Sequence, residues 1–246
     1  MSGPEMDEGA SSQNARGHSP YDRMAARYDR AMRPLEKWFL SRLRARTLAS
    51  LPDNSRLLEI GAGTGLNFPF YPQATRGAAT ELSREMLNIA RGKERPRGVQ
   101  LVQNNAESLP FPDASFDAAL ATLVLCSVAS PARCFAELRR VVRPGGTIVL
   151  LEHVRPKGLL GPFFDAFSLF TVALFDDHFN RRTAQLAQRA GLKLLRQERH
   201  ALGIINIIEL RNSQESESLE SGVKSQSRIF KFKIKANFKV RNNSES

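Results

Sequence analysis

The sequence predicts an α/β fold built on a doubly wound, mostly parallel sheet with helices on both faces. From about residue 55 onwards, short apolar runs alternate with helical segments, which is the pattern of strands joined by crossover helices. A chain of 246 residues that is 41% hydrophobic has room for one core of this kind and little room for a second. We therefore expect a single domain, over residues 21–211.

The expected elements follow one another in a regular order. A basic amphipathic helix is predicted over 21–50, with Leu35, Trp38, Phe39 and Leu43 on its apolar face and arginines, Arg42, Arg44 and Arg46 among them, on the remaining surface. Within the core at 55–154, strands are predicted at 57–60, 78–80, 99–102, 116–121 and 147–151, and helices near 65–71, 83–91 and 131–140. Arg143-Pro144-Gly145-Gly146 ends the last of these helices and begins the fifth strand.

Residues 155–211 are expected to complete the sheet and to cover a bound substrate. Asn180 can cap a helix over 181–190 that ends at Gly191, and 192–199 and 204–210 then follow as two final strands. The apolar segment 158–175 is interrupted by Gly161-Pro162 and Asp165, so it predicts a buried or lid helix rather than a membrane span.

The two ends of the chain have a different composition. Residues 1–20 consist largely of Ser, Gly, Glu and Asp, which predicts a disordered N-terminus. Residues 212–246 form a low-complexity basic tail, within which apolar residues alternate with Lys or Asn over 229–240. This alternation is typical of a strand with a cationic face, but we expect a mostly disordered tail that is dispensable for the chemistry. The absence of a signal-peptide pattern and the presence of two cysteines favour a cytoplasmic location.

A glycine-rich turn follows the first predicted strand, in the stretch from Glu59 to Gly65. Such turns let the backbone approach a ligand closely, although an ordinary tight turn has the same composition. The spacing is G-x-G-x-G, with Leu66 in place of the third glycine of a dinucleotide fingerprint, so a pyrophosphate is not the favoured ligand. Glu81, at the end of the second strand, can accept hydrogen bonds from ribose hydroxyls. Together these features predict an adenosine-containing ligand.

These motifs, in this order, resemble the class I S-adenosylmethionine-dependent methyltransferases, including the methyltransferase type 11 domain. The resemblance covers residues 21–210 and rests on E-x-G-x-G-x-G at 59–65, ELSREML at 81–87, NAESLPFPDASFDAA at 105–119 and LRRVVRPGG at 138–146. YDRMAARYDR at 21–30 is similar to the quinone-biosynthesis C-methyltransferases. TLVLCSV at 122–128, LLEHV at 150–154 and LFDDHFNRRT at 174–183 look closer to a methyltransferase-like, thiol-methylating subfamily. The resemblance implies a Rossmann-like seven-stranded sheet and S-adenosyl-L-methionine as cofactor.

The same resemblance implies a role for each motif residue. Gly61, Gly63 and Gly65 would wrap the methionine end of the cofactor with Glu59 nearby, Glu81 and Leu82 would bind the ribose, Asn105, Ala106 and Glu107 would flank the adenine, and Thr122 would line the methyl-transfer side. Many relatives have Asp where this chain has Asn105, but an amide oxygen can still accept a hydrogen bond from the adenine amino group. No residues have metal-ligand spacing, so no metal is expected.

A small, lipophilic acceptor such as a thiol, a quinol or a lipid headgroup fits the sequence best. The Phe-rich segment 158–175 would build an apolar wall beside the methyl group, although core packing explains it equally well. If the acceptor must lose a proton, His153 at the end of the fifth strand and His178 beside two aspartates are the candidate bases. Packing or helix-entry polarity is the alternative explanation for each histidine. Cys126 and Cys134 are expected to be packing residues.

The net charge of +11 leaves other partners open. The basic helix is compatible with peripheral contact with an anionic membrane, or with a plain solvated face. An RNA- or nucleic-acid-modifying methyltransferase is the alternative function, but no RNA-binding module is present, and the phenylalanines of the alternating tail face away from its lysines. A non-catalytic protein that binds S-adenosylmethionine is the third reading. The acceptor atom and the oligomeric state are not predicted.

Overall fold

The computed structural model describes residues 25–153 and 182–213. All described elements belong to the first of two units into which the chain divides, Met1–Asn212 and Ser213–Ser246, with Ser213 alone at the border. The predictions for 1–20, the apolar segment 158–175, His178, Asn180 and the tail fall outside the described residues. Within 25–153 and 182–213, no helix has both the length and the apolar character that a membrane span requires.

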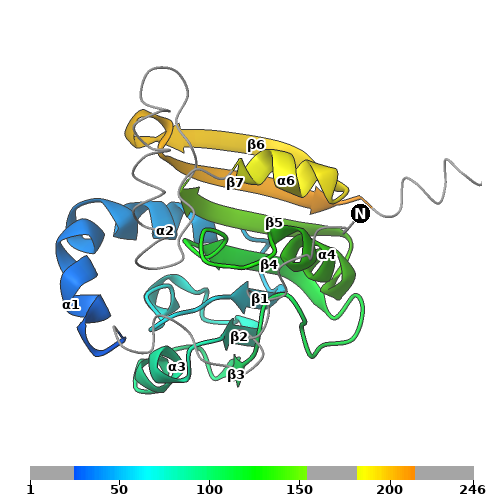
Figure 1. Ribbon diagram of the computed structural model, residues 1–246. Coiled ribbons are helices and arrows are strands. Elements are labelled where there is room, and N and C mark those ends of the chain that lie inside the picture. The colour runs from blue at the N-terminus through cyan, green and yellow to red at the C-terminus, as the bar shows by residue number, and fades with distance from the viewer. Residues whose placement is uncertain (1–24, 154–181, 214–246) are drawn as a thin grey trace, which may run out of the picture. The chain divides into compact units, whose positions relative to one another are not determined.

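A seven-stranded sheet forms the centre of the fold, in the order β3-β2-β1-β4-β5-β7-β6 (Figure 1). Its strands are β1 (Arg56–Ile60), β2 (Arg76–Glu81), β3 (Gly98–Gln103), β4 (Phe116–Thr122), β5 (Val142–His153), β6 (Leu192–His200) and β7 (Ile205–Asn212). β1 to β5 are parallel, and β7 is antiparallel to both β5 and β6. The predicted mostly parallel, doubly wound sheet is confirmed. Its strand order reverses between β1 and β4, which places a ligand crevice at the carboxyl ends of these strands.

Helices pack around the sheet, and two of them begin at serine N-caps. They are α1 (Ala25–Leu35), a π-helical turn η3 (Glu36–Leu40), α2 (Ser41–Leu48), α3 (Arg84–Arg91), α4 (Pro131–Val141) and α6 (Thr183–Arg189), with short 3-10 turns η4 (Phe68–Phe70) and η5 (Ala201–Gly203). The hydroxyl of Ser83 accepts the N–H of Met86, and that of Ser130 accepts the N–H of Arg133. These two N-caps explain why α3 and α4 start where the sequence predicts them.

Three predicted boundaries are wrong. The helix expected over 65–71 is only the 3-10 turn η4, because Pro69 and Pro72 have no N–H to donate and Gly65 has a φ of +82°. β5 begins at Val142, so the RPGG stretch lies inside the strand, with Gly145 at a φ of +74° and a register shift in the pairing with β4. α6 begins after Arg182, which makes no side-chain cap.

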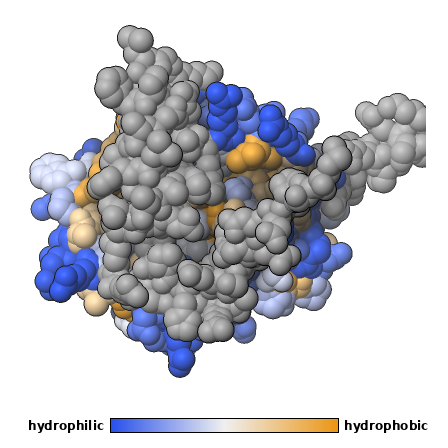
Figure 2. Space-filling view, viewed as in Figure 1, coloured by the Kyte–Doolittle hydropathy of each residue, from blue (hydrophilic) through white to orange (hydrophobic). Residues whose placement is uncertain are grey.

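Two apolar clusters fill the two faces of the sheet. One joins β1, β4 and β5 to α4 and contains Leu58, Phe135 and Ile148; the other joins the same strands to α2 and contains Leu40 and Leu120. Cys134 is fully buried in the first cluster, in agreement with its expected packing role. Figure 2 shows mostly hydrophilic residues along the outline of the described surface and hydrophobic residues further inward. The carboxyl ends of β1 and β4 are therefore fixed by packing from both sides.

The apolar face predicted for the N-terminal helix is only partly correct. Leu43 is buried, as expected, but Leu35 is 43% exposed and Trp38 is 76% exposed. Arg44, expected on the surface, is only 4% exposed. Pro34 and the π-helical turn after it shift the helical register by one residue, so the α2 residues on the buried face are Leu43, Arg44, Thr47 and Leu48.

Candidate functional site

The glycine loop between β1 and η4 has the backbone conformation that only glycine adopts without strain. Gly61, Gly63 and Gly65 have φ values of +61°, +56° and +82°. A Cβ added at Gly61 would lie 2.2 Å from Val124 Cγ2, and one at Gly65 would lie 2.4 Å from the ring of Phe68. At Gly63 the nearest atom is Met86 Sδ, 3.8 Å away. Gly61 and Gly65 therefore permit close packing, whereas a Cβ at Gly63 would meet a single side-chain atom at ordinary van der Waals distance, so the backbone of Gly63 is the least crowded of the three.

Glu81 joins this loop to the start of α3. Its carboxylate accepts the backbone N–H of Gly63 at 2.8 Å through Oε2 and the backbone N–H of Ser83 at 2.8 Å through Oε1. Leu82 lies between Glu81 and Ser83. A carboxylate oxygen can accept a second hydrogen bond, so Glu81 remains suited to ribose hydroxyls while it fixes the middle of the glycine loop.

The loop after β3 carries the residues expected around the adenine. Asn105 Oδ1 accepts the backbone N–H of Glu107 at 2.9 Å, which forms a turn with Ala106 at its tip. The carboxylate of Glu107 points to the amino end of α4, where it accepts the N–H of Ser130 at 2.8 Å and forms an ion pair with Arg133 at 2.6 Å. Asn105 thus shapes this loop, and Glu107 attaches it to α4.

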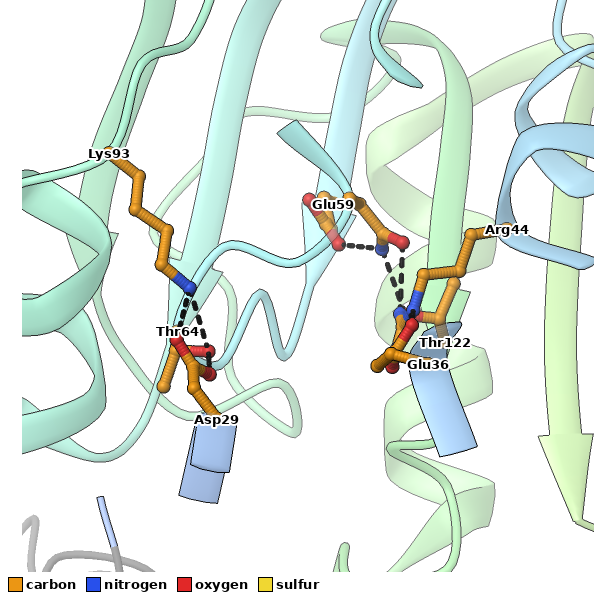
Figure 3. A network of polar contacts seen from close by, with 8 residues as sticks. Asp29, Glu36, Arg44, Glu59, Thr64, Lys93 and Thr122 are labelled. Atoms are coloured by element: carbon orange, nitrogen blue, oxygen red, sulfur yellow. Dashed lines mark hydrogen bonds and ion pairs between the residues drawn. The ribbon is translucent and has the colours of Figure 1, made fainter. Parts of the chain in front are cut away.

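A buried polar network lies where β1 and β4 end (Figure 3). Arg44 Nη1 donates to Asn67 Oδ1 at 2.9 Å and to Thr122 Oγ1 at 2.8 Å, while the other side of its guanidinium forms an ion pair with Glu36 at 2.8 Å. Asn67 Nδ2 donates to both Thr122 Oγ1 and Glu59 Oε1. The network joins the N-terminal helix, the glycine-loop region and two strand ends.

Glu59 is the innermost member of this network and is fully buried. Its second carboxylate oxygen accepts the hydroxyl of Tyr71 in a short contact. Burial raises the pKa of Glu59, and burial together with the Glu59 charge raises the pKa of Tyr71 well above its usual value. Both Glu59 oxygens are therefore engaged by side chains, and Glu59 acts on the site by orienting Asn67.

A second polar cluster holds α1 against the glycine loop (Figure 3). Thr64 donates its hydroxyl to Asp29 Oδ1 at 2.5 Å, and Lys93 forms an ion pair with Asp29 Oδ2 at 2.6 Å. Asp29 belongs to the YDR motif at 28–30, whereas Thr64 stands between Gly63 and Gly65. The N-terminal helix is thus attached to the site at two points, through Asp29 and through Arg44.

The turn after β4 lies against the glycine loop. Leu123 has a φ of +58°, and the buried carboxylate of Glu152 accepts the N–H groups of Val124 and Leu125, both at 3.0 Å. This turn packs Val124 against Gly61, and Cys126, two residues later, is buried. Glu152 is therefore a positioning residue for the side of the crevice where methyl transfer is expected.

His153 ends β5 on the same face of the sheet as Thr122. Thr122 pairs with Leu151, and His153 follows two residues later, so strand alternation directs both side chains to the face that α2 covers. Burial lowers the pKa of His153 to about 4. The imidazole is therefore neutral at pH 7 and can accept a hydrogen bond, but it is a weak base.

This pKa predicts a pH dependence of stability. Because the unfolded chain binds a proton near the usual histidine pKa of about 6.5 and the folded chain does not, the free energy of unfolding should fall as the pH drops from 6.5 to 4. The contribution is fully present above pH 6.5. In His153→Gln this part of the acid sensitivity should be lost, as measured by denaturant unfolding across pH. If the free energy of unfolding depends on pH with the same slope in both proteins, the pKa of His153 is not lowered in the folded chain.

Several residues of the site were not predicted from the sequence. Contacts between distant segments bring five further residues into the site: Asn67, Tyr71, Asp29, Lys93 and Glu152. Only Arg44 had a local signal, because it occupies a position of the buried face defined by Leu40, Leu43 and Thr47.

Comparison with known proteins agrees with this geometry. The model of a family described as "Methyltransferase domain" matches residues 58–150, from β1 to β5. A demethylmenaquinone methyltransferase of Renibacterium salmoninarum is 30% identical over 170 residues, which cover 67% of this chain and 69% of that protein. Among solved structures, an S-adenosylmethionine-dependent methyltransferase from Thermotoga maritima superposes with a TM-score of 0.62 at 24% identity, over 79% of this chain and 99% of that one. This superposition supports the fold.

Two other relatives differ in the acceptor that they are named for. A phosphatidylethanolamine N-methyltransferase of Cereibacter sphaeroides is 38% identical over 47% of this chain and 59% of its own length. Thiol S-methyltransferase TMT1B of Mus musculus is 39% identical over 43% of this chain and 46% of its own length. The chain thus spans about half the length of these two relatives. With the glycine cradle, the Glu81 anchor and the strand order, these similarities show that the chain belongs to the class I S-adenosylmethionine-dependent methyltransferases, with S-adenosylmethionine as its cofactor.

Proposed function

We propose that this protein transfers the methyl group of S-adenosylmethionine to a small, lipophilic acceptor that carries a thiol, a quinol or a lipid headgroup. The observation that carries the proposal is the glycine loop at Gly63, where an added Cβ would meet only Met86 Sδ, at 3.8 Å, and where the Gly63 N–H donates to Glu81. The contact of Thr64 with Asp29 attaches the N-terminal helix to the same loop. The names of the relatives, which include quinone, thiol and lipid methyltransferases, support an acceptor of this size and polarity.

Each residue of the site is given the role that the family resemblance implies, where its contacts support that role. Gly63 and the N–H groups around it hold the methionine end of the cofactor, Glu81 with Leu82 holds the ribose, and the turn at Asn105 and Ala106 borders the adenine. Glu59 and Glu107 act indirectly, because their carboxylates are bound to neighbouring side chains and to the amino end of α4. Thr122 is held by Arg44 and Asn67 on the methyl-transfer side.

The chemistry demands positioning more than acid–base catalysis. Bound S-adenosylmethionine supplies a methyl group that its sulfonium already activates, and alignment of two reactants can lower a barrier by roughly 7–11 kcal/mol. The chain then has to orient the acceptor and exclude water. His153, neutral at pH 7, can accept a hydrogen bond from a hydroxyl or thiol of the acceptor. His178, outside the described residues, is the second candidate for this role.

Substitution of Glu81 tests the cofactor site. Glu81→Ala removes the acceptor of the Gly63 and Ser83 N–H groups, so the affinity for S-adenosylhomocysteine should fall by roughly 1–3 kcal/mol in calorimetry. Glu81→Gln should lie between wild type and Glu81→Ala, because an amide has one acceptor oxygen. Glu85→Ala is the matched control, since Glu85 is an exposed carboxylate in the first turn of α3. If Glu81→Ala binds as tightly as Glu85→Ala, the ribose site is misplaced.

The release of S-adenosylhomocysteine across a panel of thiols, quinols, amino-headgroup lipids and RNA tests the acceptor. Turnover with a small lipophilic compound supports the proposal, and turnover only with RNA supports nucleic-acid modification instead. Tight cofactor binding without any turnover would favour a non-catalytic role. With an active acceptor in hand, His153→Gln and His178→Gln should lower turnover without changing cofactor affinity, and the defect should shrink at a pH where the acceptor ionises by itself. Full activity in both variants would mean that the enzyme acts only by positioning the acceptor and the cofactor.

A further inference from the structure

The outer side of the N-terminal helix combines exposed apolar side chains with exposed cations. Trp38 is 76% exposed and Leu35 is 43% exposed, which is unusual for large apolar residues so near a site. We define the Trp38 face by six exposed residues, Arg30, Arg33, Leu35, Lys37, Trp38 and Arg42. Lys37 Nζ lies 5.9 Å from the centre of the Trp38 ring, so charge and apolar surface are in direct contact.

The charge of the Trp38 face is not balanced by acids on the same helix. Across α1, η3 and α2 the only carboxylates are Asp29 and Glu36. Asp29 is paired with Lys93 and Thr64, and Glu36 is paired with the buried Arg44. Both acids are therefore paired within the contacts that hold the helix to the site. The charged residues of the Trp38 face are thus all cations.

The π-helical turn explains why Trp38 points outward. A π turn adds one residue to a turn, so residues eight apart come onto the same helix face as if they were seven apart. Glu36, the first residue of η3, and Arg44, in α2, are eight apart and form their ion pair in this way. The same turn buries Leu40 and leaves Trp38 exposed. The exposure of Trp38 is therefore tied to the geometry that sends Arg44 into the site.

We propose that the Trp38 face docks the protein on an anionic lipid bilayer, with Trp38 and Leu35 in the headgroup region and the cations at lipid phosphates. Trp38 combines an apolar ring with an N–H donor, as membrane-interface residues do, and aliphatic Leu35 adds apolar surface that cannot stack on a nucleic-acid base. Figure 1 places α1 and α2 at the edge of the sheet where β4 and β5 end. This inference rests on the proposed function: docking on the bilayer would bring the cofactor site next to a lipophilic acceptor in the membrane.

Trp38 is the only tryptophan in the chain, so its fluorescence reports directly on this face. The full-length protein is titrated with vesicles of phosphatidylcholine alone and of phosphatidylcholine with phosphatidylserine. We expect a blue shift of the emission, and quenching by brominated acyl chains, only with the anionic vesicles, both of which weaken as salt rises. Vesicle flotation of the protein without any change in emission would show that another basic segment binds the lipid, and it would overturn the proposal.

Matched variants distinguish lipid binding through the Trp38 face from a general attraction of the positively charged protein to anionic lipid. Trp38→Ala should lower the partition coefficient about 10-fold, whereas Leu202→Ala, which removes an 84% exposed leucine on η5, should leave it unchanged. Arg33→Gln combined with Arg42→Gln should lower it roughly 30-fold, at about 5-fold for each cation. The control, Arg189→Gln combined with Lys193→Gln, removes the same charge from exposed positions on α6 and β6. Equal losses in the two pairs would overturn the proposal.

The two proposals fail in different ways. Binding of S-adenosylhomocysteine, measured in the same variants, should remain at the wild-type level, because no residue of the Trp38 face belongs to the crevice. If the cofactor binds and Trp38 ignores lipid, the docking surface is wrong and the proposed function stands. If Trp38 responds to lipid and the cofactor does not bind, the proposed function is wrong. A shift with RNA and none with anionic vesicles would assign the face to nucleic acid.

Discussion

Gly63→Arg is expected to abolish binding of S-adenosylhomocysteine while the protein remains folded. The glycine has only Met86 Sδ, at 3.8 Å, near the position of an added Cβ, so a long side chain has room and occupies the space of the ligand. The strain of a side chain at a φ of +56° costs about 1–2 kcal/mol, which a domain of this size tolerates. Calorimetry should show no measurable heat of binding, and circular dichroism should show a native melting transition.

Two alanine variants define what this result means. Gly63→Ala carries the same backbone strain without filling the cradle, so it should bind S-adenosylhomocysteine with an affinity close to that of wild type. Gly61→Ala should instead lose stability, because its Cβ would lie 2.2 Å from Val124 Cγ2 and would push the turn after β4 away. If Gly63→Arg binds normally, the cofactor does not occupy the glycine loop.

The succession of strands along the chain was predictable because each strand has a local signal. The apolar runs of β1, β2 and β4 are bounded by polar turns, and Ser83 and Ser130 mark the starts of α3 and α4. The helix expected near 65–71 is wrong because Pro69 and Pro72 have no N–H groups to donate, so that only one 3-10 turn forms. The two prolines therefore determine the local structure of this stretch.

The glycine loop was also predictable from a local signal, but the residues that hold it in place were not. Gly61, Gly63 and Gly65 sit in one motif, whereas the contacts of Arg44 with Asn67 and Thr122 join residues 23 and 78 positions apart. A sequence pattern gives no sign that an arginine on a helix and a threonine at the end of a strand will meet. Glu59 shows a further limit, since its place in the motif suggested a ligand contact and its burial assigns it to Tyr71 and Asn67.

Arg44→Ala is expected to be the most damaging substitution outside the glycine loop. The side chain is 4% exposed and donates to Glu36, Asn67 and Thr122. Its removal leaves Glu36, which is 15% exposed, without its cation and leaves the buried Asn67 Oδ1 without the Arg44 donor, while Thr122 Oγ1 keeps its hydrogen bond from Asn67 Nδ2. Loss of one partner of a buried ion pair costs about 3–5 kcal/mol, so the free energy of unfolding should fall by this amount in denaturant titrations.

Arg42→Ala is the matched control, because Arg42 is exposed on the same helix and should change stability by less than about 0.5 kcal/mol. Glu36→Gln completes a double-mutant cycle: if Glu36 acts through Arg44, adding Glu36→Gln to Arg44→Ala should cost less than it does in wild type. Arg44→Lys keeps the charge but cannot reach both Glu36 and the Asn67–Thr122 pair, so it should recover part of the stability and less of the affinity for S-adenosylhomocysteine. A cycle in which the two effects simply add, with Arg44→Ala as mild as Arg42→Ala, would mean that the N-terminal helix closes the crevice without this network.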